Sequence, residues 1–386
     1  MPESFIKLYN PLNFIAGPGA LRKIGSIARL YGAKALFLGS ERSLAAAGDR
    51  IRQSLSEAGV SYTIHSFSGI PTDKEAEGYA AIVQDEGAEL VIAAGGGRVC
   101  DVAKEAAAIA DLPVLTAPTI TATNASFRRN TIVYNEEGSY IRRELNKESP
   151  RYVLADTDIL ARQSRRYLDS GIIDSLVRLY ESEPYHLIYE GELPFTFNYG
   201  IAQALYQFFA VNEKAIHQDF AKGRSTPLVE DTVTAIVGLA GIASNYMSHI
   251  KTGGFAHPFY NGVTWVNPRR TYLHGEIVGF GILVQLSLLG VGESRFDREL
   301  SLLQSYGLRY GLAEFGLGRE EIQALARRLY EKDVPRLPFL AHVKSAEQIQ
   351  EAMLFADRKV RLACQSTGPA VYRGTPAPRS QKAAAL

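Results

Sequence analysis

The sequence predicts two domains, an α/β domain built on a parallel sheet followed by an all-helical domain. Three observations support this fold class. Short apolar runs alternate with segments of helical periodicity over the first 160 residues. Beyond about residue 156 the segments lengthen and strand patterns become scarce. A length of 386 residues is also typical of two or three domains. We therefore divide the chain into an α/β domain (1–160), a helical domain (161–365) and a tail (366–386).

The first domain is expected to contain strands at residues 35–39, 61–67, 89–94 and 113–117. The first of these runs is apolar and ends in glycine, which is typical of a buried parallel strand. Helices are expected between the strands, at residues 49–58, 75–86 and 102–110. Ile51, Leu55 and Ala58 recur at the spacing of one helix face. This alternation predicts a parallel sheet that helices cover on both faces.

The second domain is expected to consist of long helices, at residues 194–211, 232–249, 275–289, 319–331 and 346–354. The most apolar run, residues 277–291, contains Gln285 and is too short to cross a bilayer comfortably, so we interpret it as a buried core helix. The tail is rich in proline, alanine and glycine, and we expect it to be flexible.

The overall charge excludes several classes of protein. The 42 Lys and Arg residues nearly balance the 41 Asp and Glu residues, for a net charge of +1. Nucleic-acid binders and polybasic membrane-surface proteins normally carry a basic excess. Cys100 and Cys364 are too few for a disulfide scaffold, and residues 1–9 lack the order of a signal peptide. We expect a soluble, cytoplasmic protein with a small-molecule substrate and with no nucleic-acid or membrane partner.

A glycine-rich turn joins a predicted strand to a predicted helix. Gly95, Gly96 and Gly97 follow the run 89–94, and backbone without side chains can approach a phosphate at a helix start. The spacing matches neither of the two standard nucleotide-binding glycine motifs, so a tight turn without a ligand is the alternative. A second turn, residues 17–19, is expected to open a helix.

Two of the seven histidines stand out by their context. His257 follows a glycine pair, and His274 directly precedes the most apolar helix. Two histidines and one carboxylate from elsewhere in the chain would form a three-ligand metal site with one open position. Spacing alone does not show that the residues converge, and a histidine without a special role is the alternative.

Taken together, these segments resemble the iron-containing alcohol dehydrogenase superfamily, and most closely its glycerol dehydrogenase-like branch. The matching segments, in chain order, are residues 14–21, 95–104, 117–123, 256–258 and 274–276. The second is similar to the family motif GGG-x-x-x-D-x-A-K. The resemblance implies a dehydroquinate synthase-like fold, with a dinucleotide-binding domain followed by a helical metal-binding domain, and a homo-oligomer.

The resemblance also implies the site residues. Asp174, His257 and His274 match the ligands of a divalent metal, with zinc favoured over iron, and Ile173 replaces a glycine of the Asp motif. In the family this metal acts as a Lewis acid on the substrate oxygen while hydride passes to the nicotinamide. With Asn124, these ligands form the expected catalytic set. The expected cofactor contacts are Ser40, Gly95, Gly96, Gly97, Arg98, Val99, Asp101, Thr119, Ile120, Ala122, Thr123, Arg128, Asn130 and Tyr134.

Several positions depart from the branch pattern. Asn124 stands where glycerol dehydrogenases carry an Asp that contacts substrate, which makes glycerol itself doubtful. Arg128 and Arg129 fill a loop that usually has small residues. They would either clamp a carboxylate or phosphate of substrate or cofactor, or form a solvated pair. Tyr260 replaces the second histidine of the family's H-x-x-H-N-G motif, and Arg178 occupies the position of a third histidine found in the other branch.

The nicotinamide cofactor is expected to be NAD, with NADP as the alternative. Ser40 occupies the place of an Asp that binds the adenosine ribose in NAD-specific relatives. Arg42 would attract the 2′-phosphate of NADP, whereas Glu41 would take the role of the Asp and keep NAD.

Three functional hypotheses follow. The first is a metal-dependent, NAD(P)-linked alcohol dehydrogenase or carbonyl reductase acting on a polyol, a hydroxy acid or a phosphorylated analogue. The second is a lyase or cyclase that resembles dehydroquinate synthase and uses NAD transiently on a phosphorylated sugar acid. The third is a non-catalytic binding protein, suggested by Ile173, Asn124 and Tyr260.

Overall fold

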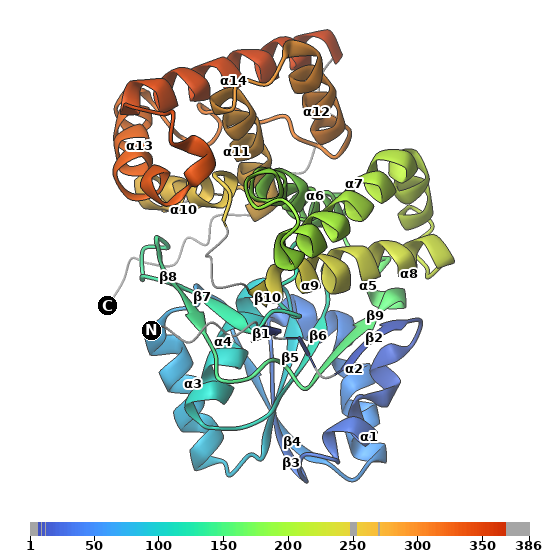
Figure 1. Ribbon diagram of the computed structural model, residues 1–386. Helices are drawn as coiled ribbons and strands as arrows, with labels where there is room; N and C mark the ends of the chain where they lie inside the picture. Colours follow the sequence, from blue (N-terminus) through green and yellow to red (C-terminus); the bar gives the residue numbers. More distant parts are fainter. Residues whose placement is uncertain (1–6, 9, 12, 248–252, 269–270, 368–386) are drawn as a thin grey trace, which may run out of the picture.

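The computed structural model describes residues 7–8, 10–11, 13–247, 253–268 and 271–367. An α/β domain forms the lower half of Figure 1, and helices form the upper half. The last strand of the main sheet ends at Asp156, and the first long helix of the upper half begins at Arg165. This order confirms the predicted fold class, whereas the boundary at residue 160 stays a prediction.

The main sheet has six parallel strands in the order β2-β9-β6-β5-β3-β4. The four predicted strands are confirmed as β3 (Lys34–Gly39), β4 (Ser61–Ser66), β5 (Leu90–Gly95) and β6 (Val114–Pro118). The sheet also contains two strands that the sequence analysis did not predict, β2 (Asn13–Gly17) and β9 (Tyr152–Asp156). The order of the strands along the chain reverses between β3 and β5, whose carboxyl ends therefore flank the crevice where ligands bind in such sheets.

Helices cover both faces of this sheet, as predicted (Figure 1). On one face lie α1 (Ile24–Ala28) and α2 (Glu41–Glu57), and on the other α3 (Asp73–Asp85) and α4 (Gly97–Ile109). Phe37 of β3 belongs to the core under α2, while its neighbour Leu38 belongs to the core under α4. Successive residues of the strand thus bury opposite faces.

Two helix starts were placed too late. The predicted helix 49–58 begins at Glu41, because Ser40 caps it by accepting a hydrogen bond from the Ser43 amide. The helix predicted at 102–110 begins at Gly97, directly after the glycine turn. Both helices begin with residues that give no apolar pattern, Glu41-Arg42-Ser43 in α2 and Gly97-Arg98 in α4, so the helical periodicity starts later than the helix. The turn at residues 17–19 opens the short 3-10 helix η1 (Ala20–Lys23), as expected.

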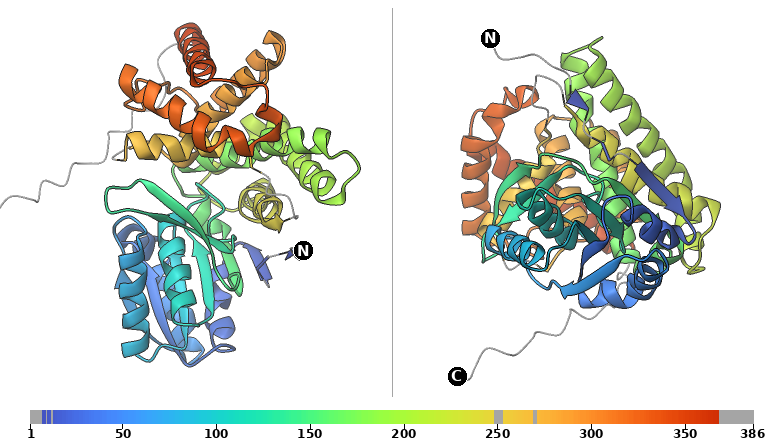
Figure 2. Two further views of the ribbon diagram at one scale, coloured as in Figure 1. Left: turned by 60° about the vertical axis from the view of Figure 1, so that its left-hand side comes forward. Right: turned by 90° about the horizontal axis from the view of Figure 1, so that it is seen from below.

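An antiparallel hairpin of β7 (Asn130–Tyr134) and β8 (Tyr140–Leu145) was not predicted. It rises from the α/β domain toward the helical domain (Figure 2). The Tyr140 amide donates a hydrogen bond to Thr264 in the helical domain, at 2.9 Å. A second two-stranded pair joins β1 (Lys7–Leu8) to β10 (Tyr246–Met247).

After β9, the elements of the described residues are helices apart from β10. These helices are α5 (Thr157–Leu160), α6 (Arg165–Ile188), α7 (Leu193–Phe220), α8 (Pro227–Val233), the π-helix η2 (Thr234–Leu239), α9 (Ala240–Asn245), α10 (Ala256–Val266), α11 (His274–Leu288), α12 (Glu293–Ser305), α13 (Arg319–Lys332), the 3-10 helices η3 (Val334–Arg336) and η4 (Pro338–Leu340), and α14 (Ala346–Thr367). Residues 275–286 of α11 are all buried, which confirms the predicted core helix. Within the described residues, no helix has the length and apolarity needed to cross a membrane.

Several predicted helices have different limits. The helix predicted at 232–249 begins at Pro227, passes through a π-helical segment and ends at Asn245 before β10. The π segment contains Gly238, which packs against the ring of Phe14. Helix α7 continues nine residues beyond the predicted 211, and α14 continues to Thr367 rather than 354. The rest of the predicted flexible tail, residues 368–386, and residues 248–249 lie outside the described residues.

Candidate active site

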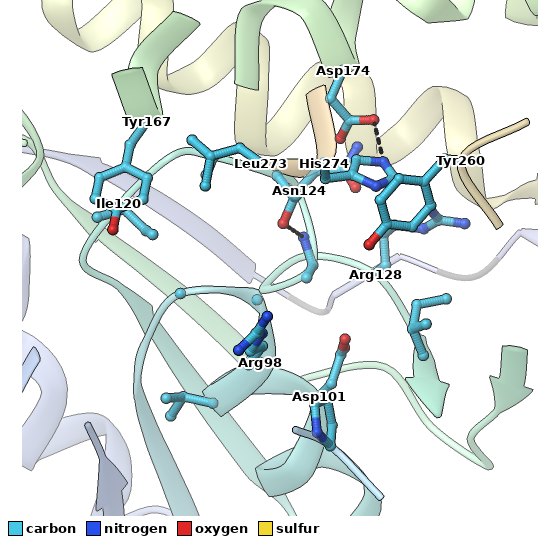
Figure 3. Close-up of a pocket in the computed structure, with 18 of the residues that line it drawn as sticks. Arg98, Asp101, Ile120, Asn124, Arg128, Tyr167, Asp174, Tyr260, Leu273 and His274 are labelled. Atoms are coloured by element: carbon cyan, nitrogen blue, oxygen red, sulfur yellow. Dashed lines mark hydrogen bonds and ion pairs between the residues drawn. The ribbon is translucent and has the colours of Figure 1, made fainter. Parts of the chain in front are cut away.

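A cleft of about 2330 Å³ lies between the two domains. Its floor consists of the loops that follow β3, β5 and β6, and its roof of residues from α6, α10 and α11. Figure 3 shows Arg98 and Asp101 on the floor, facing Asp174 and His274 on the roof. A ligand in this cleft therefore contacts both domains.

The glycine turn forms the centre of the floor. Gly96 is the N-cap of α4, and no side chain caps the helix there. The first-turn amides of α4 therefore face the cleft, which Gly96 and Gly97 line, at the positive end of a helix of 13 residues. Ser40, at the end of the neighbouring strand β3, lies on the other side of the crevice. This geometry fits the phosphates of a dinucleotide.

The other predicted cofactor residues also line the cleft, except Gly95, which ends β5 below it. Several of them already have partners in the protein, among them Ser40 and Asp101. The Ser40 hydroxyl takes part in capping α2, and the Asp101 carboxylate forms a 3.0 Å ion pair with Lys104. Burial raises the pKa of Asp101, although Lys104 opposes this effect. The assignment of these residues to a cofactor stays a prediction.

Lys104 shapes the floor from below. Its side chain is almost fully buried, and its ammonium group donates hydrogen bonds to the carbonyls of Ala125, Arg128 and Asn130 at 2.7–3.1 Å. The lysine of the GGG-x-x-x-D-x-A-K motif thus fixes the loop that carries Asn124 and Arg128. A buried ammonium with four oxygen partners is well satisfied.

The three predicted metal ligands converge on the roof. Asp174 comes from the middle of α6, His257 from the first turn of α10, and His274 from the start of α11. One donor atom from each lies within 4.8 Å of the other two. The Asp174 Oδ1 atom is 3.4 Å from His257 Nε2. It is 3.3 Å from His274 Nε2, a contact drawn as a dashed line in Figure 3. Two imidazoles and one carboxylate at this spacing fit a divalent metal with an open position toward the cleft.

A carboxylate that the sequence analysis missed supports His257. Glu181 Oε1 lies 2.6 Å from His257 Nδ1, the ring nitrogen that faces away from the triad. This contact keeps the other ring nitrogen, Nε2, directed at Asp174. Gly254 is needed for this approach, because a Cβ atom there would overlap the Glu181 side chain. Glu181 follows Asp174 by seven residues, two helical turns on the same face of α6, which is the signal that could have found it.

Arg178 also reaches the ligand atoms. Its Nη2 lies 3.4 Å from Asp174 Oδ1 and 3.3 Å from His257 Nε2, and its Nη1 lies 3.4 Å from Glu181 Oε2. The position that carries a metal-binding histidine in the other branch therefore holds a fixed positive charge at the edge of this triad.

The ionisation of the triad follows from these contacts. Burial opposes the charged form of Asp174, but His274, His257 and Arg178 hold its pKa well below the ordinary value. Burial lowers the pKa of His274 despite the attraction of Asp174. The same burial acts on His257, but Glu181 and Asp174 outweigh it and raise its pKa.

Close backbone packing places Asp174 over the floor. A Cβ atom at Gly171 would overlap the carbonyl oxygen of Thr121, so only glycine allows α6 to contact this loop. The Thr121 amide in turn donates to the Gln163 side chain at 2.8 Å. Ile173, which departs from the family motif, is buried and packs against Gly279 of α11. The departure is accommodated between α6 and α11 without displacing Asp174 from the triad.

Asn124 and Tyr260 line the cleft beside the triad. The Asn124 side chain is 2% exposed, and its Nδ2 has no hydrogen-bond partner among the described residues. The Tyr260 hydroxyl lies 3.2 Å from that of Tyr134, and its ring packs edge-on against His274. Glu276, the acid of the second histidine motif, is held by Arg166 and accepts a hydrogen bond from the Leu273 amide at the start of α11.

Comparison with known proteins agrees with this geometry. The family model described as iron-containing alcohol dehydrogenase matches residues 11–157. A glycerol dehydrogenase of Pseudomonas putida is 29% identical over 91% of this chain and 97% of its own length. Hydroxycarboxylate dehydrogenase A of Escherichia coli is also 29% identical, over 75% of this chain and 80% of its own. The solved structure of glycerol dehydrogenase from Schizosaccharomyces pombe superimposes with a TM-score of 0.83 at 23% identity, covering 95% of this chain and 93% of that one.

The chain is similar to the iron-containing alcohol dehydrogenase family over residues 11–157 and, over most of its length, to dehydrogenases with which it shares 29% identity. It is accordingly an oxidoreductase that acts on CH–OH groups, and the family implies a nicotinamide dinucleotide, a divalent metal and a small-molecule substrate.

Proposed function

We propose that the protein is a metal-dependent, NAD(P)-linked alcohol dehydrogenase or carbonyl reductase acting on a small polar alcohol. One observation carries this proposal: Asp174, His257 and His274 bring their donor atoms together across the cleft from the uncapped start of α4. Metal and nicotinamide sites that face each other across one cleft are what hydride transfer requires. The dehydrogenase relatives support the same reaction class.

Each group of residues in the cleft has a separate role in this reaction. Asp174, His257 and His274 would hold the metal, which supplies Lewis-acid polarisation of the substrate oxygen. Glu181 orients His257 through its 2.6 Å contact. The α4 amides would bind the cofactor phosphates, and the loop fixed by Lys104 would hold the substrate. In the oxidation, the alcohol carbon gives a hydride to the nicotinamide and its hydroxyl releases a proton to solvent.

Within this proposal, NAD is favoured over NADP and zinc over iron, because the resemblance points to a branch with those preferences. Glu41 and Arg42 both line the cleft next to Ser40, so the acidic and the basic side chain are both near the predicted ribose position. A homo-oligomer is expected on the resemblance alone.

The test is oxidation of NADH or NADPH by a panel of small ketones and aldehydes, followed by near-ultraviolet absorbance with and without a chelator. We expect turnover that the chelator abolishes and a divalent metal restores. Asp174→Ala and His274→Ala should lose both activity and the metal measured by elemental analysis. His65→Ala is the matched control, because His65 pairs with Glu86 on the sheet edge and does not line the cleft. Undiminished turnover in Asp174→Ala would overturn the metal assignment, and product formed without net oxidation would favour the cyclase alternative.

A further inference from the structure

Two hydrogen-bond donors of one floor loop face the cleft and lack partners among the described residues. The Nε atom of Arg128 and the Nδ2 atom of Asn124 are both buried, and neither has a hydrogen-bond partner in the part of the chain that the structure describes. Both residues line the cleft. Because buried donors are normally satisfied, an unpaired guanidinium Nε and an unpaired amide nitrogen in one cleft indicate an absent acceptor.

The backbone of this loop is fixed, so the two donors keep their positions. The Arg128 amide donates to the Asn124 carbonyl at 3.3 Å, which places the two residues one turn apart. Lys104 holds the Arg128 carbonyl at 3.1 Å. Figure 3 shows Arg128 beside Tyr260 and His274, on the side of the cleft that holds the predicted metal ligands. The donors therefore lie on the same side of the cleft as the triad.

The charge around Arg128 is positive. Burial, together with the charges of Arg178 and Arg143, lowers the pKa of Arg128 to about 10. The nearby carboxylates already have partners, since Asp101 pairs with Lys104 and Asp174 lies within 3.4 Å of two histidines and Arg178. An incoming anion would supply the negative charge that this part of the cleft lacks.

The mouth of the cleft is also basic. A second pocket of about 470 Å³ lies between β8 and α13 and shares Tyr140, Arg143 and Asp333 with the main cleft. Among the described residues that line it, Asp333 is acidic, and Arg142, Arg143, Arg328, Lys332 and Arg336 are basic. Arg142 is already paired with Asp73 and Glu144, so the positive charge that remains comes from the other four. In a chain with a net charge of +1, this is a local concentration of positive charge. Such a mouth attracts small anions.

We propose that Arg128 and Asn124 bind the oxyanion of an acidic substrate, a carboxylate or a phosphate ester, whose alcohol or carbonyl group faces the Asp174–His257–His274 triad. This inference rests on the proposed function and narrows it from small polar alcohols to anionic ones. It also explains why an amide replaces the aspartate of glycerol dehydrogenases, since a carboxylate at residue 124 would repel the substrate. Arg128 then serves substrate binding, in place of the cofactor contact expected from the family.

The test compares three ketones that share one carbon skeleton: 2-oxobutanoate, neutral 1-hydroxybutan-2-one, and the phosphate ester of 1-hydroxybutan-2-one. Each reaction consumes NAD(P)H and one proton and yields the alcohol and NAD(P)⁺. We expect one of the two anions to exceed the neutral ketone in kcat/KM by at least about tenfold, which also identifies the oxyanion. Arg128→Leu should lower kcat/KM for that anion by about 30- to 100-fold, while kcat/KM for the neutral ketone changes by less than about threefold.

Two controls separate this role from others. Arg129→Leu removes the same charge from the next residue, whose guanidinium donates to the Asn146 carbonyl and does not line the cleft, and it should keep the anion preference. Arg128→Lys should retain part of the preference for the anionic ketone that Arg128→Leu loses. NADH binding, followed by fluorescence, and metal content should match the unaltered protein in Arg128→Leu. Weakened NADH binding instead would assign Arg128 to the cofactor and overturn the proposal.

Failure of the proposed dehydrogenase function gives a different result from failure of the anion site. In that case none of the ketones reacts and the chelator has no effect, but the oxyanion site is still measurable by calorimetry with 2-hydroxybutanoate and with the phosphate ester. Binding of either one that Arg128→Leu weakens at least tenfold supports the anion site without the reaction. Equal kcat/KM for neutral and anionic ketones, or no binding of either anion, overturns it.

Discussion

The floor and the roof of the cleft present different kinds of group to a ligand. On the floor, the ligand-facing groups around the glycine turn are main-chain amides, and Lys104 holds the adjacent loop by its carbonyls. On the roof, the ligand-facing groups are charged or imidazole side chains from three helices, held by one another. Floor geometry therefore depends on local backbone, whereas roof geometry depends on tertiary contacts between distant segments.

This difference predicts how each side responds to substitution. A floor change should act mainly through folding, because it disturbs the backbone of a whole loop. A roof change should act mainly through metal and substrate binding, because the helices that carry the ligands are held together by one apolar core, to which the ligand side chains do not belong. The following variants test this contrast.

The largest effect is expected for Lys104→Met on the floor. The substitution leaves Asp101 without its ion-pair partner and three loop carbonyls without their donor. We expect a loss of about 3–5 kcal/mol in the free energy of unfolding, measured by urea denaturation. Lys74→Met is the control. Lys74 is exposed, and its ion pair with Glu136, at 3.8 Å, is loose and exposed too, so the free energy of unfolding should change by less than about 0.5 kcal/mol. If the Lys104→Met protein were as stable as the unaltered protein but bound less metal, the claim that floor changes act through folding would be wrong.

Glu181→Gln on the roof should change metal binding without large loss of stability. The amide loses the charge that holds His257 Nδ1 at 2.6 Å, so we expect metal affinity to fall about 10- to 100-fold in competition with a chelating dye. Glu183→Gln removes a carboxylate from the same helix that pairs with Arg295 instead, and its metal affinity should be unaltered. Equal affinities in the two variants would exclude Glu181 as a support of the site.

Asn124→Asp tests the floor loop where it meets the substrate. A carboxylate at this position would neutralise Arg128 and repel an anion, so kcat/KM for the preferred anionic ketone should fall about 30-fold. The same variant should gain activity toward 1-hydroxybutan-2-one, which moves its specificity toward neutral substrates. A parallel fall for both ketones, measured by NADH oxidation, would show that residue 124 has no part in selecting charge.

The smallest effect is expected for Arg178→Gln. The guanidinium lies within 3.4 Å of two predicted ligand atoms, and its removal lessens the repulsion that a metal cation meets there. We expect metal affinity to rise about fivefold in the same dye competition. A decrease would show that Arg178 serves chiefly to position Glu181, which it contacts at 3.4 Å.

The sequence was informative where one segment determines the structure by itself. The strand before Gly95 and the apolar helix after His274 were predicted because their patterns are local. The convergence of Asp174 with the two histidines was expected only through the family resemblance. Helix α6 was not predicted, because buried polar residues such as Asp169 and Asp174 interrupt its apolar pattern. Glu181 and the direction of Arg128 depend on contacts between segments far apart in the chain.

The contact between Gly171 and the Thr121 carbonyl also sets the height of the cleft. Backbone touches backbone there, so helix α6 lies as near to the threonine loop as two main chains can. Any side chain at residue 171 would push α6, and with it Asp174, away from that loop. The distance over which a hydride must pass is therefore held by a residue that has no side chain and no role in the chemistry.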